Sequence, residues 1–301
     1  MKDEPGAIDG RLIDARHELV NRIWGEQGQL LYNHSLLCQL NLPYRNPGDG
    51  VRRYQRKSGR VSLQVEAGYI FNGDEFVPVG LPWGSRSRLL MLHLCSEAVK
   101  NNSAIVEVES SFTAFAKTLG LSVNGANLRS LRDQVQRMSA VQLRIAWDHG
   151  THADQGGVRP VFSKLRAEFP KHPRQRVLWT SFVEFHHDFY QSLREHAVPL
   201  QLTAIMGLRN SARSLDLYTW LASRLVRVKR PTRVSWYQLQ DQFGAPGMDR
   251  KSFKRNIKSS LKKVLYVYPE AKVDAVTGGV LLHRSPPPVR KRRVGEIISS
   301  S

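Results

Sequence analysis

The chain has 301 residues, which is enough for two domains, and its 41% hydrophobic and 24% charged residues are typical of a globular protein. Its net charge of +19 is unusual and indicates a polyanionic partner, with nucleic acid favoured over an anionic membrane. Residues 199–301 hold 20 Lys or Arg against 6 Asp or Glu, a net of +14, whereas residues 1–198 carry a net of +5. We therefore expect the C-terminal third to provide most of the electrostatic binding.

Several classes of protein are excluded by the same composition. Cys38 and Cys95 are far apart and form no CxxC pattern, so we expect free thiols, a reducing compartment and no structural zinc. The N-terminus is polar and acidic, unlike a signal peptide. No apolar run approaches the roughly 18–20 residues of a membrane span. These features predict a soluble, cytoplasmic protein that does not bind a membrane.

Residues 1–75 are predicted to form an N-terminal extension. One or two helices are expected within residues 11–40, followed by an exposed, turn-rich loop over 43–60 and a strand with period-2 alternation over 61–70. The loop is basic, and its cations either contact phosphate without specificity or are simply solvated: Arg52, Arg53, Arg56, Lys57 and Arg60. A breaker-rich segment at 78–85 marks a boundary.

After this boundary the chain repeats one order of elements. The first copy, within residues 76–198, has expected helices at 87–100, 111–121 and 126–140, strands at 104–109 and 141–147, and a return at 159–169. The second copy, within residues 199–284, has expected helices at 212–228, 236–244 and 249–265, a strand at 231–236 and a β-hairpin at 271–284 with a Thr-Gly-Gly turn. A strand and a helix are expected between the copies, at 176–200.

Helix–strand–helix–helix–hairpin is the order of a winged helix-turn-helix, whose third helix enters the major groove and whose hairpin reaches the backbone beside it. The sequence therefore predicts an α+β fold with two tandem winged helix-turn-helix domains and a short N-terminal extension. We assign dimerisation or backbone contacts to the first domain and sequence-specific DNA binding to the second. Residues 285–301 are expected to be a flexible tail with cations at Arg290–Arg293.

The third helix of the second copy, "DRKSFKRNIKSSLKKVL" at 249–265, carries seven Lys or Arg and one acid, Asp249, which is placed to cap its start. At about 100° per residue, the face expected to pack on the core comprises Phe253, Ile257, Leu261, Val264 and Leu265. The opposite face comprises Lys251, Arg255, Lys258, Ser259 and Lys262. Arg250 and Lys254 fall near the core boundary.

A merely solvated face normally mixes charges of both signs, so this helix favours DNA contact. Lys251 and Arg255, near the start of the helix, are the expected base readers, because Arg can contact guanine O6 and N7 together. Lys258 and Lys262 are expected to contact phosphate. The hairpin adds Lys272, Arg284 and the amides of two turn glycines, although turn glycines need no ligand to explain them.

The third helix of the first copy is less suited to DNA. Its expected outward residues are Arg129, Asp133 and Arg137, and the acid in the middle of that face is unfavourable beside phosphate. A phosphate-contacting role for Arg129 and Arg137 stays open beside two alternatives, an ordinary exposed helix and a subunit contact.

No catalytic motif is present: the sequence lacks G-x-x-x-x-G-K-[ST], G-x-G-x-x-G and H-E-x-x-H. His186 and His187 are adjacent, so their side chains diverge on a strand and lie about 100° apart on a helix. His149 and His152 lie in a Gly-rich turn without further ligands. We therefore expect no metal, no cofactor and no enzymatic activity. A rolling-circle DNA nickase using Tyr190 is retained as an alternative.

Several segments resemble the plasmid-encoded RepA replication initiator family and, more loosely, TrfA-like initiators. These segments are "EFVPVGLPWGSRSRLLMLHLCSEAV" (75–99), "FAKTLGL" (115–121), "RQRVLWTS" (174–181), "LREHAVPL" (193–200), "SARSLDLYTWLASRL" (211–225) and "VYPEAKV…GGVLLHRSPPPV" (267–289).

The resemblance implies two winged-helix domains that bind repeated sites (iterons) in double-stranded DNA at a plasmid origin. It also implies help in opening the origin, recruitment of the host initiator and replicative helicase, and copy-number control through active monomers and restraining dimers. A winged-helix transcriptional repressor is the alternative among DNA-binding proteins.

Overall fold

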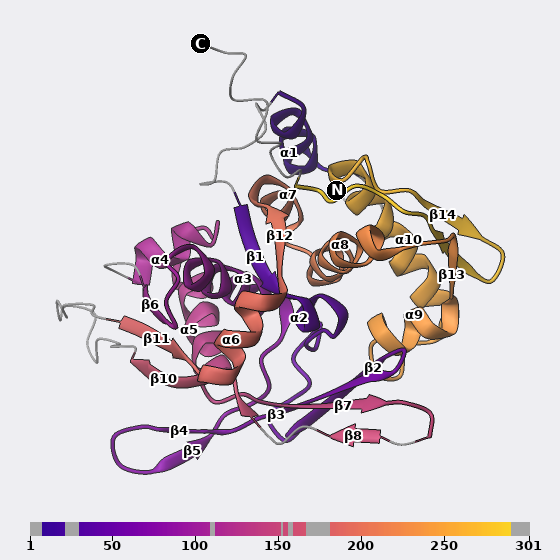
Figure 1. Cartoon of the computed structure of the whole chain (residues 1–301). Coiled ribbons are helices and arrows are strands. Elements are labelled where there is room, and N and C mark those ends of the chain that lie inside the picture. Colours follow the sequence, from indigo (N-terminus) through magenta and orange to yellow (C-terminus); the bar gives the residue numbers. More distant parts are fainter. Residues whose placement is uncertain are drawn as a thin grey trace.

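The structure is a computed structural model that describes residues 8–21, 30–108, 112–151, 153–155, 159–166 and 181–289, and it is a mixed α and β fold (Figure 1). The helices are α1 Gly10–Asn21, α2 Ser35–Gln39, α3 Gly84–Lys100, α4 Phe112–Thr118, α5 Gly125–Ser139, α6 His187–His196, α7 Leu202–Leu208, α8 Ala212–Arg224, α9 Trp236–Phe243 and α10 Arg250–Val267. None of the helices in these described ranges is long and apolar enough to cross a membrane.

The strands come mostly in runs, β2–β5 and β7–β11, between groups of helices. They are β1 Leu30–His34, β2 Arg53–Ser58, β3 Val61–Glu66, β4 Tyr69–Phe71, β5 Phe76–Pro78, β6 Ile105–Val108, β7 Gln142–Asp148, β8 Ala153–Gln155, β9 Arg159–Pro160, β10 Phe162–Arg166, β11 Ser181–Phe185, β12 Ala197–Gln201, β13 Thr232–Ser235, β14 Val273–Val276 and β15 Gly279–Leu282.

The second copy contains every element that the sequence predicts, in the expected order. Helices α8, α9 and α10 pack together, and strand β13 pairs with β15, which pairs with β14. Val276 lies opposite Gly279, so the hairpin turn consists of Thr277 and Gly278. These elements depend on local apolar spacing and turn residues. The sequence therefore predicts them without information about distant contacts.

The first copy departs from the expected order in its strand pairing. Strand β7 does not form a simple hairpin with residues 159–169, because it pairs with β3, β8 and only the short β9. The rest of the expected return, β10, pairs instead with β11, and β11 pairs with β6. The strands of the first copy therefore belong to two different sheets. The sheet that contains β7 also includes β2 and β3 of the N-terminal region.

Residues 43–60 are not one solvated loop, which corrects the expectation from sequence. Strand β2 occupies residues 53–58 and pairs with β3, and Tyr54 on its inner face is 7% exposed. The inward-facing Arg56 donates to the carbonyl oxygen of Gly244, at the end of α9. Arg52 donates to the carbonyl oxygens of Ala67 and Gly68, at 2.6 and 2.8 Å. These two cations are therefore structural, whereas Arg53, Lys57 and Arg60 are exposed.

The N-terminal region also contacts the second copy. Residues 30–34, expected to be helical, form β1 and pair antiparallel with β12. Helix α1 packs on α7 and α10, where Arg16 donates to the Tyr266 carbonyl at 2.8 Å. The reason the strand was missed is that its partner lies more than 160 residues later in the chain.

Candidate nucleic-acid interface

Helix α10 is anchored by a well-defined start and a buried inner face. The Asp249 carboxylate accepts a hydrogen bond from the Ser252 amide at 2.9 Å, and this bond lowers the pKa of Asp249. Phe253, Ile257 and Val264 are 0–1% exposed, and Leu261 is buried as well. The orientation predicted from helical spacing is thus confirmed, with Leu265 half-buried at the edge.

The opposite face of α10 is open to solvent. Its exposed cations are Lys251, Arg255, Lys258 and Lys262, and Ser259 is half-buried between them. None of the seven Lys or Arg side chains of α10 forms an ion pair with a carboxylate of the described residues. Like charges on one helix repel, so a polyanion lying along this face would relieve an unfavourable interaction.

Two aromatic residues at the start of α9 position further cations. The Arg250 guanidinium lies 3.5 Å from the centre of the Tyr237 ring, and Tyr237 is 63% exposed. The ammonium groups of Lys254 and Lys258 lie 6.0 and 5.9 Å from the centre of the Trp236 ring. Arg250 is therefore exposed and stacked rather than close to the core. Cations held on aromatic faces are partly ordered before any ligand arrives.

The cation beside the turn of the hairpin β14–β15 is Arg233, not the predicted Lys272 or Arg284. Lys272 and Arg284 are exposed, but they precede β14 and follow β15, at the open end of the hairpin. At the turn, Arg233 of β13 donates to the Thr277 carbonyl at 2.6 Å. Gly278 has a φ of +83°, and a Cβ there would lie 2.1 Å from the Arg233 guanidinium. The glycine is thus required by both its conformation and its neighbour.

Sequence reasoning missed Tyr237 and Arg233 as candidate site residues. The sequence does contain a signal for Tyr237. Two aromatic residues follow the Ser235 helix cap, and because Trp236 is the buried one, its neighbour Tyr237 is left exposed. No local pattern pointed to Arg233, since its position depends on the pairing of β13 with β15.

Arg129 of the first copy is exposed, as predicted. Arg137 is buried, so the prediction that its side chain faces outward was wrong. Arg137 is 7% exposed and donates to Asp133 at 2.7 Å and to Asp49 at 2.8 Å. The segment that contains Asp49 covers this side of α5, which the helical spacing alone does not reveal. Asp133 serves as a partner of Arg137, so its place on the helix has a structural explanation.

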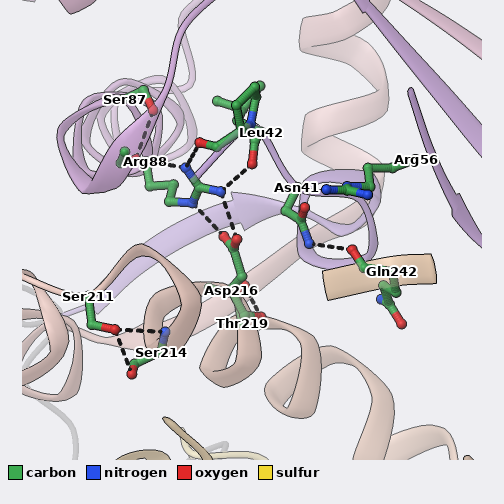
Figure 2. Close-up of polar contacts among 12 residues, drawn as sticks. Asn41, Leu42, Arg56, Ser87, Arg88, Ser211, Ser214, Asp216, Thr219 and Gln242 are labelled. Carbon is green, nitrogen blue, oxygen red and sulfur yellow. Dashed lines mark hydrogen bonds and ion pairs between the residues drawn. The ribbon is translucent and has the colours of Figure 1, made fainter. Parts of the chain in front are cut away.

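A buried ion pair joins helix α3 of the first copy to helix α8 of the second (Figure 2). Arg88 of α3 donates to both carboxylate oxygens of Asp216 of α8, at 2.7 and 2.8 Å, and each residue is 7% exposed. Burial raises the pKa of Asp216, and the guanidinium of Arg88 opposes that rise. Arg88 also donates to the carbonyl oxygens of Leu42 and Gly84, at 2.6 and 2.7 Å.

The end of α9 is fastened to the N-terminal region by two hydrogen bonds in addition to that of Arg56. Asn41 donates to the Gln242 carbonyl at 2.8 Å (Figure 2). The Gln242 side chain donates to the Gln39 carbonyl at 2.6 Å. The turn between α9 and α10 is therefore positioned by residues about 200 positions earlier in the chain. These contacts join the packing of α10 on α8 and α1 in placing the helix relative to the rest of the molecule.

The groups considered for catalysis are not assembled into a site in the described part of the chain. Tyr190 is 7% exposed, and its hydroxyl lies 3.5 Å from the Asn102 side chain, so it is not presented to a phosphodiester. Within the described ranges, no three His, Cys, Asp or Glu residues could hold a metal ion together. His152 and the tail Arg290–Arg293 lie outside the described residues. Cys38 and Cys95 are free and buried, as expected.

Comparison with solved structures supports the fold. Two crystal structures of domains 2 and 3 of RctB are similar to this chain, each with a TM-score of 0.52. They share 11% and 12% sequence identity, covering 77% and 82% of this chain and 84% and 94% of theirs. At this identity the likeness concerns the fold alone. No curated protein matches the chain.

The sequence also matches a family model. Residues 81–238, from three residues before α3 through the first turn of α9, match the model described as plasmid encoded RepA protein. This span is more than half of the 301 residues and includes both partners of the Arg88–Asp216 pair. The chain belongs to the family of plasmid-encoded RepA proteins, which are replication initiators.

Proposed function

We propose that this initiator binds repeated sites in plasmid origin DNA, with α10 in the major groove. The observation that carries the proposal is the exposed cationic face of α10, which forms no ion pair with the described acids and follows α9 in a helix–strand–helix–helix–hairpin order. That order is typical of a winged helix-turn-helix, in which β14–β15 is the wing. We extend the assignment to two tandem winged-helix domains, at residues 76–198 and 199–284.

Within this proposal the cations have different roles. Lys251 and Arg255 lie in the first half of α10 and read bases, whereas Lys258 and Lys262 contact phosphate. Arg250, supported by Tyr237, and Arg233, beside the wing turn, extend the phosphate contacts. Lys272 and Arg284 contribute from the open end of the wing. Arg129 is the remaining candidate in the first copy, and Arg137 is removed from the set because it is buried.

Binding by this surface would allow the bacterial protein to act in the cytoplasm on its own plasmid. We propose that the bound protein helps to open the origin and recruits the host initiator and replicative helicase, and that a monomer–dimer equilibrium limits copy number. No catalytic role is assigned to the chain.

The proposal is tested by measuring DNA affinity against salt concentration for single variants. Arg255→Ala should cost about 1–3 kcal/mol and relax the preference at one base pair. Lys262→Ala should weaken binding to all sequences similarly and reduce the slope of log K against log salt by about one unit. Arg194→Ala removes the same charge from the exposed side of α6 and is the matched control, with affinity and slope unchanged.

If Arg255→Ala and Lys262→Ala both bind as the wild type does, α10 is not the reading helix. Footprinting and denaturing electrophoresis with DNA beside the gene separate the alternatives. A transcriptional repressor would protect a dimeric operator without direct repeats, and a nickase would leave a covalent adduct with the DNA.

A further inference from the structure

A mostly apolar cavity of about 320 Å³ lies between the sheet that contains β3 and β7 and the helices α2 and α6 (Figure 1). Leu63 of β3 and Ile145 of β7 belong to its sheet wall, and Leu37 of α2 and Phe189 of α6 belong to its helical wall. Protein sites for small molecules have volumes of about 300–1,000 Å³ and a predominantly hydrophobic lining with a few polar groups. The cavity has the size and the lining of such a site.

The cavity opens to solvent beside two of its lining residues. Trp147, near the end of β7, is 37% exposed, and Asp188, in the first turn of α6, is exposed as well. Water inside an apolar cavity finds few hydrogen-bonding partners, so its displacement by an apolar molecule is favourable. A small molecule therefore has both a route into the cavity and a favourable free energy of entry.

One pair of polar side chains in the lining provides a hydrogen-bond donor for a ligand. The imidazole Nδ1 of His34 accepts a hydrogen bond from the Leu36 amide at 3.1 Å, so the ring proton is on Nε2, which donates to the Ser192 hydroxyl at 3.0 Å. The Ser192 oxygen thus serves as an acceptor, while its own proton has no acceptor among the described residues. Because Ser192 lines the cavity, this proton is available to a ligand that carries an acceptor such as a carbonyl group.

The charges around the cavity select a neutral ligand. None of the described residues that line it is Lys or Arg, and the carboxylate of Asp188 at the opening repels an anion. Burial, with a smaller contribution from His196, lowers the pKa of His34 to about 4, so this imidazole is uncharged at neutral pH. A charged head group placed beside Ser192 would be buried without a counterion, which is strongly unfavourable.

The helical wall of the cavity is next to the hydrogen bonds that fasten the turn between α9 and α10. Leu40, which directly follows α2 and is 1% exposed, lines the cavity. Its two neighbours, Gln39 and Asn41, are the residues that bond to Gln242 of α9. A ligand that packs on Leu40 therefore stabilises the segment that holds the end of α9.

The sheet wall has the same relation to that turn. Leu63 is the strand partner of Arg56 on β2, and Arg56 donates to the Gly244 carbonyl at the end of α9. An occupied cavity favours the conformation in which both walls are in place, and this is also the conformation that holds the turn before α10. A ligand shifts an equilibrium by its difference in affinity for two conformations, so occupancy of the cavity is linked to the presentation of α10.

We propose that this cavity binds a neutral, mostly apolar small molecule with one hydrogen-bond acceptor, and that the bound molecule raises the affinity of α10 for DNA. The binding site follows from the cavity itself, whereas its effect on DNA rests on the proposed function. Couplings between two sites are typically about 5–150-fold, and we expect at least about fivefold here. By linkage, DNA must raise the affinity for the small molecule by the same factor.

Fluorescence titration of the full chain with Prodan, a neutral naphthalene with one carbonyl group, tests the site. The wild type should bind Prodan saturably, and it should bind the anionic anilinonaphthalene sulfonate at least about tenfold more weakly. Leu37→Trp and Ile145→Phe fill the cavity from opposite walls and should each weaken Prodan binding at least about tenfold. Val123→Trp is the matched control, because Val123 is 43% exposed in the loop before α5 and lies outside the cavity lining, and it should bind Prodan like the wild type.

Ser192→Ala removes the hydroxyl donor and keeps the volume of the cavity. It should weaken Prodan binding about three- to tenfold, because one hydrogen bond is lost, and move the Prodan emission to shorter wavelength. Thermal denaturation separates a filled cavity from a misfolded chain. Saturating Prodan should raise the melting temperature of the wild type, and each filled variant should melt in one cooperative transition that Prodan does not shift.

DNA affinity measured with and without saturating Prodan tests the effect on α10. The wild type should bind DNA at least about fivefold more tightly with Prodan, and Leu37→Trp should not respond. Absence of saturable Prodan binding, wild-type binding by the folded Leu37→Trp and Ile145→Phe variants, or equal binding of the sulfonate would each overturn the site. Unchanged DNA affinity of the Prodan-saturated wild type would overturn the effect on α10 and leave the site standing. Failure of Arg255→Ala to alter DNA affinity would count instead against the proposed function, and the Prodan titration would be unaffected.

Discussion

Replacing Asp216 by Asn tests whether the Arg88–Asp216 pair holds the two copies together. The substitution leaves the Arg88 guanidinium buried at 7% exposure without its counterion. Removing one partner of a buried ion pair typically costs about 3–5 kcal/mol, because the remaining charge is not compensated. We expect the lower end of this range, about 3 kcal/mol, because the carbonyl oxygens of Leu42 and Gly84 still accept hydrogen bonds from Arg88.

Arg88→Met should cost more than Asp216→Asn, since it leaves a buried carboxylate and also removes the donor from those carbonyls. In the double variant Arg88→Met/Asp216→Leu no buried charge remains, so the total loss should be smaller than the sum of the two single losses. The free energy of unfolding is measured by urea denaturation, with the melting temperature as a second readout.

The control is Lys100→Ala, which breaks the half-exposed Lys100–Glu97 pair of 3.7 Å at the end of the same helix. It should change stability by less than about 1 kcal/mol. The reasoning is refuted if Asp216→Asn costs no more than Lys100→Ala, or if the two single losses at Arg88 and Asp216 simply add.

Three further predictions concern the proposed DNA surface. Arg137→Ala should lower the free energy of unfolding by about 2 kcal/mol, through its lost hydrogen bonds to Asp133 and Asp49, and leave DNA affinity unchanged; reduced affinity at unchanged stability would restore its outward role. Tyr237→Ala should weaken DNA binding by about 0.5–1 kcal/mol because Arg250 loses its aromatic support, whereas Tyr237→Phe keeps the ring and should bind normally; equal effects of the two would implicate the hydroxyl instead. Gly278→Ala should cost about 1–2 kcal/mol of stability because of its positive φ, measured by thermal denaturation; an unchanged melting temperature would contradict the required glycine.

The sequence was most informative where structure depends on neighbours in the chain. The start of α10 at Asp249, its buried face and the turn of the hairpin all follow from caps, helical spacing and turn residues within about 35 positions of one another. The cationic face of α10 was predicted for the same reason. The spacing of residues does not identify the ligand of this cationic face, because an exposed charge alone does not specify what it binds.

The sequence was least informative where structure depends on distant segments. Residues 30–34 form a strand only because β12 pairs with them, and β7 joins β3 rather than forming the expected hairpin. Arg137 is buried because the segment with Asp49 covers it. The pairing of Arg88 with Asp216, 128 residues apart, likewise had no local signature. These contacts arise from tertiary packing, which overrides the pattern within any single segment.

The central claim is that the chain initiates replication by binding its plasmid origin through α10. The most direct test is to ask whether the gene and its flanking DNA maintain a plasmid that lacks its own origin. We predict maintenance with the wild-type chain and with Arg194→Ala, and loss with Arg255→Ala at equal protein level. Maintenance with Arg255→Ala at the wild-type copy number, or failure of the expressed wild-type chain, would contradict the claim.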